Sequence, residues 1–205
     1  FRSLLGPWVD GIQVTDQSWS AVQLSPVAAA SLVLRQGIDA IAVLTCRDRN
    51  RIALYNDLLG LRALGVTSVL LLRGTAIPKG HPLRAKTVFD TSVAELVALA
   101  AGLGDVDPPD PDKEFYVGVG ARALRPPQGW AAKSLREKSG AGARFLQIQL
   151  CFNLDLLRHY LQCLIALRLS WDYRVIVSLA PLVSAKSARW LRKNVKGARI
   201  SDAII

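Results

Sequence analysis

The chain has 205 residues, of which 51% are hydrophobic and 20% charged, a globular composition that excludes an intrinsically disordered protein. Its formal net charge of +10 indicates an anionic partner, but the basic residues are scattered and no zinc-finger, basic-region or RNA-binding motif is present, so specific nucleic-acid binding is not expected. No apolar run approaches the ~20 residues that span a bilayer, no signal-peptide pattern is visible, and the three cysteines form no CxxC motif, so we expect a soluble cytoplasmic protein with no membrane contact.

Six short apolar runs follow one another along the chain, each before a stretch with helical spacing. They cover residues 11–15, 38–45, 66–72, 114–120, 144–150 and 174–179. Their continuous hydrophobicity predicts strands buried on both faces, as in a parallel sheet. They begin about 30 residues apart, the length of one βα unit. The interval before the fourth run is longer and holds a predicted helix over 88–103 and an acidic, proline-rich loop over 105–112. A long apolar helix is predicted over 154–171.

Regular βα repeats leave two main architectures, a doubly wound sheet or a (β/α)8 barrel. Polar clusters recur at the C-terminal end of nearly every predicted strand, whereas a doubly wound sheet would concentrate them at one switch point. No GxGxxG fingerprint follows the first strand. We therefore predict an α/β fold of the (β/α)8 TIM-barrel type, with one domain over 1–205 that holds about six βα units and lacks the first and last strands.

The most informative stretch is VLTCRDRNR, residues 43–51, where a buried strand ends in a dense charged cluster before a helix. Such strand ends are where α/β proteins build ligand sites. By themselves, Arg47, Asp48, Arg49 and Arg51 would most often form an internal salt-bridge network. We predict that at least one Arg–Asp pair holds the loop, while another member of the cluster faces a ligand.

Several motifs, in this order, resemble the methylenetetrahydrofolate reductase family from about residue 9 to residue 200. They are DGIQVTD at 10–16, TCRDRNR at 45–51, RG at 73–74, KTVFD at 86–90, GVGA at 118–121 and FLQIQ at 145–149. The resemblance implies a flavin-dependent oxidoreductase of one-carbon (folate) metabolism. It also implies FAD as cofactor, NAD(P)H as a candidate electron donor and a folate-type small-molecule substrate.

The resemblance supplies a set of candidate site residues. The cofactor-binding candidates are Thr15, Thr45, Arg73, Gly74, Thr75, Gly120, Ala121 and Lys138, and the substrate-binding candidate is Gln149. Glycines let a flat ring approach the backbone, Thr and Gln offer neutral hydrogen-bonding groups, and Arg and Lys can meet phosphate charge. We predict that the strand-end members line one cavity at the C-terminal rim. No metal site is expected, because no His/Cys cluster has metal-ligand spacing.

The sequence departs from the family pattern at several acidic positions. Thr75 and Ala131 stand where the family has aspartate, and the family's catalytic glutamate lies on a first strand that the sequence does not contain, so no catalytic residue is assigned. The lost hydrogen bonds predict weak, dissociable FAD binding. The alternative is a non-catalytic barrel subunit of a one-carbon or methyl-transfer complex, acting as a homo-oligomer or with a partner subunit.

Overall fold

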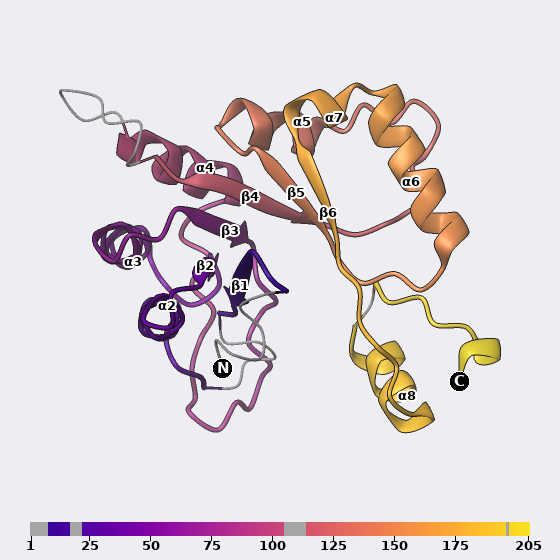
Figure 1. Ribbon diagram of the computed structural model, residues 1–205, viewed down its shortest axis with the longest axis horizontal. Helices are drawn as coiled ribbons and strands as arrows, with labels where there is room; N and C mark the ends of the chain where they lie inside the picture. Colours follow the sequence, from indigo (N-terminus) through magenta and orange to yellow (C-terminus); the bar gives the residue numbers. More distant parts are fainter. Residues whose placement is uncertain (1–7, 17–21, 105–113, 196) are drawn as a thin grey trace. The chain divides into compact units, whose positions relative to one another are not determined.

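The computed structural model describes residues 8–16, 22–104, 114–195 and 197–205 (Figure 1). The chain divides into two compact units. Unit 1 comprises Phe1–Gly118 and Gly140–Ala143, and unit 2 comprises Val119–Ser139 and Arg144–Ile205. The predicted acidic loop over 105–112 lies outside the described residues. The prediction of a single domain over 1–205 stays a prediction.

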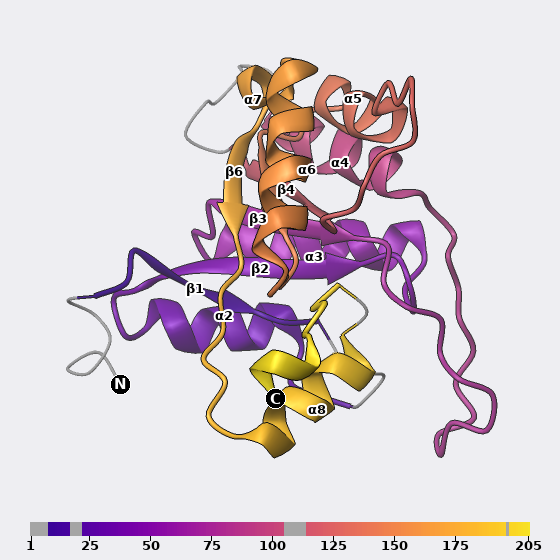
Figure 2. The same ribbon diagram turned by 90° about the vertical axis from the view of Figure 1, so that its right-hand side faces the viewer.

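Unit 1 contains three complete βα repeats and the first half of a fourth strand. Its elements are β1 (Gly11–Val14), α2 (Pro26–Leu34), β2 (Asp39–Thr45), α3 (Arg51–Ala63), β3 (Ser68–Leu72), α4 (Val93–Ala101), the 3-10 turn η2 (Gly102–Gly104) and the start of β4 (Tyr116–Ala121). The pairs β1–β2 and β2–β3 are parallel. Figure 2 shows α2 running alongside β1 and β2, the two strands that it contacts.

The helices of unit 1 begin where the sequence supplies capping groups. Ser25 caps α2 and is followed by Pro26 at the first helical position. Asn50, the last residue of the charged segment before α3, accepts a hydrogen bond from the Ala53 amide and caps that helix. Ser92 and Glu95 form a reciprocal capping box on α4. The charged and polar residues that follow β2 and β3 therefore also determine where the next helix starts.

Unit 2 continues β4 and adds two further strands. Its elements are α5 (Lys133–Gly140), β5 (Phe145–Ile148), α6 (Leu154–Ala166), α7 (Leu169–Asp172), β6 (Arg174–Val177), α8 (Ala185–Asn194) and the 3-10 turn η4 (Asp202–Ile204). The pair β5–β6 is parallel. Val195, Ala198 and Ile200, which follow α8 in the sequence, form a small hydrophobic core. Among the described residues, no helix combines the length and apolarity that crossing a bilayer requires.

The strands follow one another in the order β1-β2-β3-β4-β5-β6. Within unit 1, the Tyr116 amide bonds to the Thr67 carbonyl at 2.8 Å, and within unit 2 the Gln149 amide bonds to the Ala121 carbonyl at 2.8 Å, so β4 has a neighbour on each side. The predicted numerical order is confirmed. An order without a reversal excludes a doubly wound sheet and agrees with six βα units of a (β/α)8 fold.

Two predicted helices differ from the observed ones. The helix expected over 88–103 begins only at Val93, because Phe89 has a φ of 45° and Ser92 forms the N-cap. The prediction of one helix over 154–171 is wrong, since α6 ends at Ala166 and Arg168 has a φ of 60°. A left-handed residue cannot continue a right-handed helix, so a separate turn, α7, starts at Leu169. The apolar periodicity across the break does not reveal it.

Candidate functional site

The charged segment after β2 folds into a bonded network in unit 1, which we call the arginine cluster: Asp16, Arg47, Asp48, Arg49 and Asp57. Arg49 donates to Oδ2 of Asp57 at 2.6 Å and also donates to Oδ2 of Asp16. Arg47 donates to Oδ2 of Asp48 at 2.8 Å. The prediction that at least one Arg–Asp pair holds this loop is therefore confirmed. That another member faces a ligand stays a prediction.

Asp16 joins the ends of two neighbouring strands. It follows β1 and accepts hydrogen bonds from both the backbone amide and the hydroxyl of Thr45, the last residue of β2, each at 2.8 Å. Its side chain is 0% exposed. Burial raises the pKa of this carboxyl, while Arg49 and the two Thr45 donors act in the opposite direction. Among the residues that the structure describes, its second oxygen, Oδ1, has no hydrogen-bond partner.

Sequence reasoning did not select Asp16. The signal was present, because an acid directly after a strand lies at the edge where the next parallel strand also ends. The parallel register of β1 and β2 then brings it to Thr45, 29 positions along the chain. Thr45, a predicted cofactor residue, has its hydroxyl proton committed to Asp16. For any ligand, this hydroxyl offers only an acceptor.

Gly74 is required by the packing of the cluster itself. Its φ is 78°, a left-handed conformation that side chains rarely adopt. A Cβ at this position would lie 2.9 Å from Cβ of Arg47 and 3.1 Å from Cβ of Thr45. The end of β2 therefore fills the space that a side chain at position 74 would occupy. This packing explains why the residue is glycine, whether or not a flat cofactor ring binds nearby.

Arg73, next in the predicted set, lies over an aromatic ring. Its Cζ atom is 4.0 Å from the centroid of Phe89, a cation–π contact that leaves the edge of the guanidinium available for hydrogen bonds. A hollow of about 350 Å³ lies beside this pair and extends to the first turn of α4. Arg73 lies two positions before Thr75, which is exposed.

The acidic groups around this hollow are already bonded. Asp90 accepts from the Arg51 amide at 2.9 Å, and Glu95 accepts from the guanidinium of Arg51 at 2.9 Å and from the Ser92 amide at 2.8 Å. The hydrogen bonds from Ser92, followed by that from Arg51, lower the pKa of Glu95 to about 2. Glu95 is therefore a capping group rather than a proton donor near neutral pH.

The remaining predicted residues belong to unit 2. Gly120 and Ala121 end β4, and Lys138 is half-buried in the last turn of α5, where burial lowers its pKa. Gln149 is exposed just after β5, and its side-chain oxygen lies against Gly197, where an added Cβ would be 2.8 Å away.

The structure thus places the predicted residues at strand ends, with the exception of Lys138. In unit 1, Thr45 and Gly74 are packed together, and Arg73, the residue before Gly74, lies beside its own hollow. Thr15 directly follows β1, and its hydroxyl donates to the side-chain oxygen of Gln23 at 3.4 Å. That the residues of both units line one cavity stays a prediction.

Known proteins resemble this chain in sequence and in fold. The model of the methylenetetrahydrofolate reductase family matches residues 5–205. No curated protein matches the chain. Among solved structures, the triclinic crystal form of 2,3-dimethylmalate lyase, a PEP mutase/isocitrate lyase superfamily member, is similar with a TM-score of 0.55 and 14% identity, covering 100% of this chain and 82% of the lyase. Its trigonal form has a TM-score of 0.53 and 15% identity, covering 100% and 79%. At these identities the likeness concerns the fold alone.

Proposed function

We propose that this chain, which belongs to the methylenetetrahydrofolate reductase family, is an FAD-dependent oxidoreductase that reduces a folate-type one-carbon carrier. The observation that carries the proposal is the family match, which extends over residues 5–205 and therefore includes every predicted site residue. NAD(P)H is the proposed electron donor.

The side chains of unit 1 fit part of a flavin dinucleotide. Arg73 offers a guanidinium edge for a phosphate, and its stacking on Phe89 limits the rotamers that binding would have to order. The adjoining hollow, of about 350 Å³, is within the roughly 300–1,000 Å³ range of small-molecule sites. In unit 2, Lys138 offers a further cation, and Gly120 and Ala121 leave the end of β4 without bulky side chains. Taken unit by unit, these are the residues that would contact a cofactor.

Bound flavin would supply the hydride-transfer chemistry, and the chain would supply position and charge. Arg73 and Lys138 would bind anionic phosphate. Asp16 would hold the ends of β1 and β2 together through Thr45, so that the rim is ordered before any ligand arrives.

One observation favours a second function, a non-catalytic barrel subunit. All three carboxylates of the arginine cluster, Asp16, Asp48 and Asp57, are bonded to arginine. Reduction of a one-carbon carrier needs a group that donates or accepts a proton. Carboxylate oxygens that already accept from a guanidinium are less available to exchange a proton with a ligand. In this second function, the chain would keep the fold and the ligand hollow without the chemistry.

Titration of FAD into the purified chain, followed by flavin fluorescence, tests the proposal. We expect weak binding that weakens further as salt rises, since Thr75 and Ala131 supply no acidic hydrogen-bond partner. Arg73→Gln should weaken FAD binding about tenfold or more, the value of one hydrogen bond to a charged group. Arg35→Gln, which removes an exposed arginine after α2, is the matched control.

A second assay separates the two functions. At saturating FAD, oxidation of NAD(P)H that depends on methylenetetrahydrofolate would support the reductase. FAD binding without such turnover would favour the non-catalytic subunit. Absence of FAD binding at every ionic strength would overturn the cofactor assignment, and turnover that is independent of added flavin would overturn the flavin dependence.

A further inference from the structure

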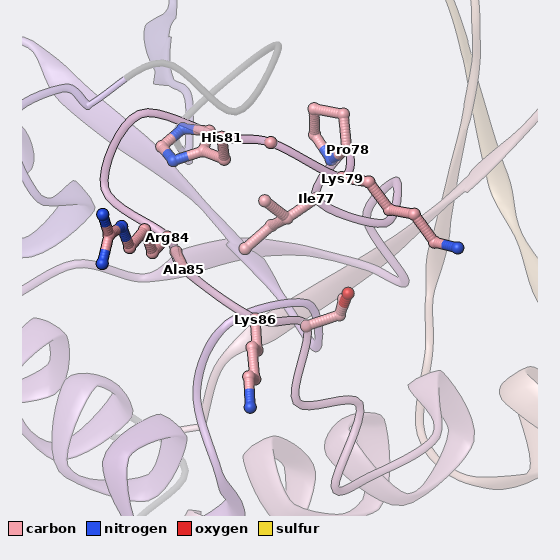
Figure 3. A pocket seen from close by; sticks show the side chains of 9 residues that line it. Ile77, Pro78, Lys79, His81, Arg84, Ala85 and Lys86 are labelled. Atoms are coloured by element: carbon pink, nitrogen blue, oxygen red, sulfur yellow. The ribbon is translucent and has the colours of Figure 1, made fainter.

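A second hollow in unit 1 lies within the loop between β3 and α4. We call residues 77–87 the basic loop. The loop borders a cavity of about 480 Å³, within the roughly 300–1,000 Å³ typical of small-molecule sites. The lining side chains that matter here are Ile77, Pro78, Lys79, His81, Arg84 and Lys86 (Figure 3). None of the predicted site residues is part of this lining.

The charged side chains of the loop are all basic. Lys79, Arg84 and Lys86 are all exposed. In the part of the chain that the structure describes, none of the three has a carboxylate within ion-pair distance, and no acidic residue lines the cavity. These solvated cations are available to an anion, because no described carboxylate competes for them.

The loop has hydrogen-bonded turns. The His81 amide bonds to the Pro78 carbonyl at 3.3 Å, and the Arg84 amide bonds to the His81 carbonyl at 2.7 Å. At the end of the loop, the Val88 amide bonds to the Arg47 carbonyl at 2.7 Å, which ties the loop to the arginine cluster. The cations are therefore carried by an ordered backbone, which lowers the entropy cost of binding.

The directions of the side chains indicate what kind of anion fits. Figure 3 shows Lys79, Arg84 and Lys86 leaving the loop on different sides, whereas Ile77 points across its interior. A single phosphate ion cannot contact all three cations in this arrangement. A chain of linked phosphates offers several anionic groups at different points, and Ile77 and Pro78 provide apolar surface for an organic group attached to it.

We propose that the basic loop is a binding site for a small ligand that carries two or more linked phosphates. Neither Arg73 nor Lys138 is among the residues that line this cavity, and the proposal does not depend on the proposed flavin chemistry. Inorganic tripolyphosphate supplies the shared chemistry without the organic group, and ADP supplies both.

Calorimetric titration of the purified chain with tripolyphosphate, at low and at physiological ionic strength, tests this proposal. We expect saturable binding that weakens with salt. The triple variant Lys79→Gln/Arg84→Gln/Lys86→Gln should weaken it about tenfold or more, because three charge contacts are lost. The control Lys186→Gln/Arg189→Gln/Lys193→Gln removes the same charge from exposed positions of α8 and should change it less than about twofold. Circular dichroism checks that both variants fold.

The outcomes are distinct. An equal loss in both triple variants would show a general charge effect and overturn the site, as would unchanged binding in the loop variant or no binding by the unmodified chain. Arg73→Gln should bind tripolyphosphate normally, and a loss there would merge this site with the proposed cofactor site. Tighter binding of ADP than of inorganic pyrophosphate would identify a nucleotide as the source of the phosphates, and equal binding would identify the phosphate chain alone.

Discussion

The arginine cluster and the basic loop are two parts of unit 1 that carry cationic side chains, and these cations have opposite surroundings. In the cluster, Arg47 and Arg49 are largely buried and bonded to Asp16, Asp48 and Asp57. In the loop, the cations are exposed and have no acidic partner among the described residues. The formal charge of +10 therefore combines groups that stabilise the chain with groups that are available to an anion.

The difference follows from where each segment lies relative to its neighbours. The cluster is held between the ends of β1 and β2 and the start of α3, where a buried cation is costly unless carboxylates meet it. The loop extends from the end of β3, where water solvates its cations and no partner is needed for folding. A substitution in the cluster should therefore change stability, and the same kind of substitution in the loop should change ligand binding.

Loss of the Asp16 carboxylate should have the largest effect. Asp16→Ala leaves Arg49 without one partner and removes both bonds to Thr45, so we expect a loss of about 3–5 kcal/mol in the free energy of unfolding, as for a broken buried pair. Chemical denaturation measures it. Asp10→Ala removes a nearby exposed acid and should change stability by less than about 0.5 kcal/mol. A loss below about 1 kcal/mol for Asp16→Ala would contradict the role of the cluster.

Alanine substitutions at two glycines with the same backbone conformation distinguish the cost of backbone strain from the cost of close packing. Gly74 and Gly80 have φ of 78° and 81°, but only Gly74 has neighbours within 4 Å of the Cβ position. Gly80→Ala should cost about 1–2 kcal/mol from the backbone alone. Gly74→Ala should cost about 2–4 kcal/mol, because its methyl group meets Cβ of Arg47. Equal losses in thermal or chemical denaturation would show that the contact with the cluster is easily relieved.

The shape of the guanidinium should matter in the cluster and not in the loop. Arg49 reaches Asp16 and Asp57 with different nitrogens, which a single ammonium group cannot do in the same geometry. Arg49→Lys should therefore cost about 1–2 kcal/mol of stability. Arg84→Lys in the basic loop should change stability by less than about 0.5 kcal/mol. If the two variants melt at the same temperature, Arg49 acts only as a charge.

The smallest expected effect concerns pH. The pKa of Glu95 falls to about 2 in the folded chain, from 4.5 for an ordinary glutamate, mainly because of the Ser92 hydrogen bonds. A lowered folded-state pKa stabilises the chain above pH 4.5, and this stabilisation is lost as pH falls towards 2. Glu95→Gln should therefore melt below the unmodified chain at pH 6, with the difference shrinking towards pH 2. Glu137→Gln serves as the control, and a difference that is constant with pH would argue against the capping role.

Much of the architecture follows from local patterns. The apolar runs predicted all six strands and their numerical order. Burial on both faces, which continuous hydrophobicity predicts, fits β2 to β5 but not β1 and β6, which are first and last in the order and only partly buried. The break at Arg168 escaped prediction, since helical spacing continues through it and only the backbone conformation differs. The charged segment 47–51 was recognised as an internal network, but its chief partner, Asp16, was not.

The sequence by itself determined the repeating βα units and the family of this chain, since both depend on residue types at short, regular spacing. Only the tertiary structure decided which arginines are neutralised. Asp16 and Arg49 are 33 positions apart, and a parallel pairing of β1 and β2 is needed to bring them into contact. Likewise, the sequence shows Lys79, Arg84 and Lys86 close together, but whether a carboxylate approaches them depends on distant segments. Hydrophobic patterns are local because each residue is buried or exposed by its own element, whereas ion pairs are nonlocal because a charge needs a partner that the fold must deliver.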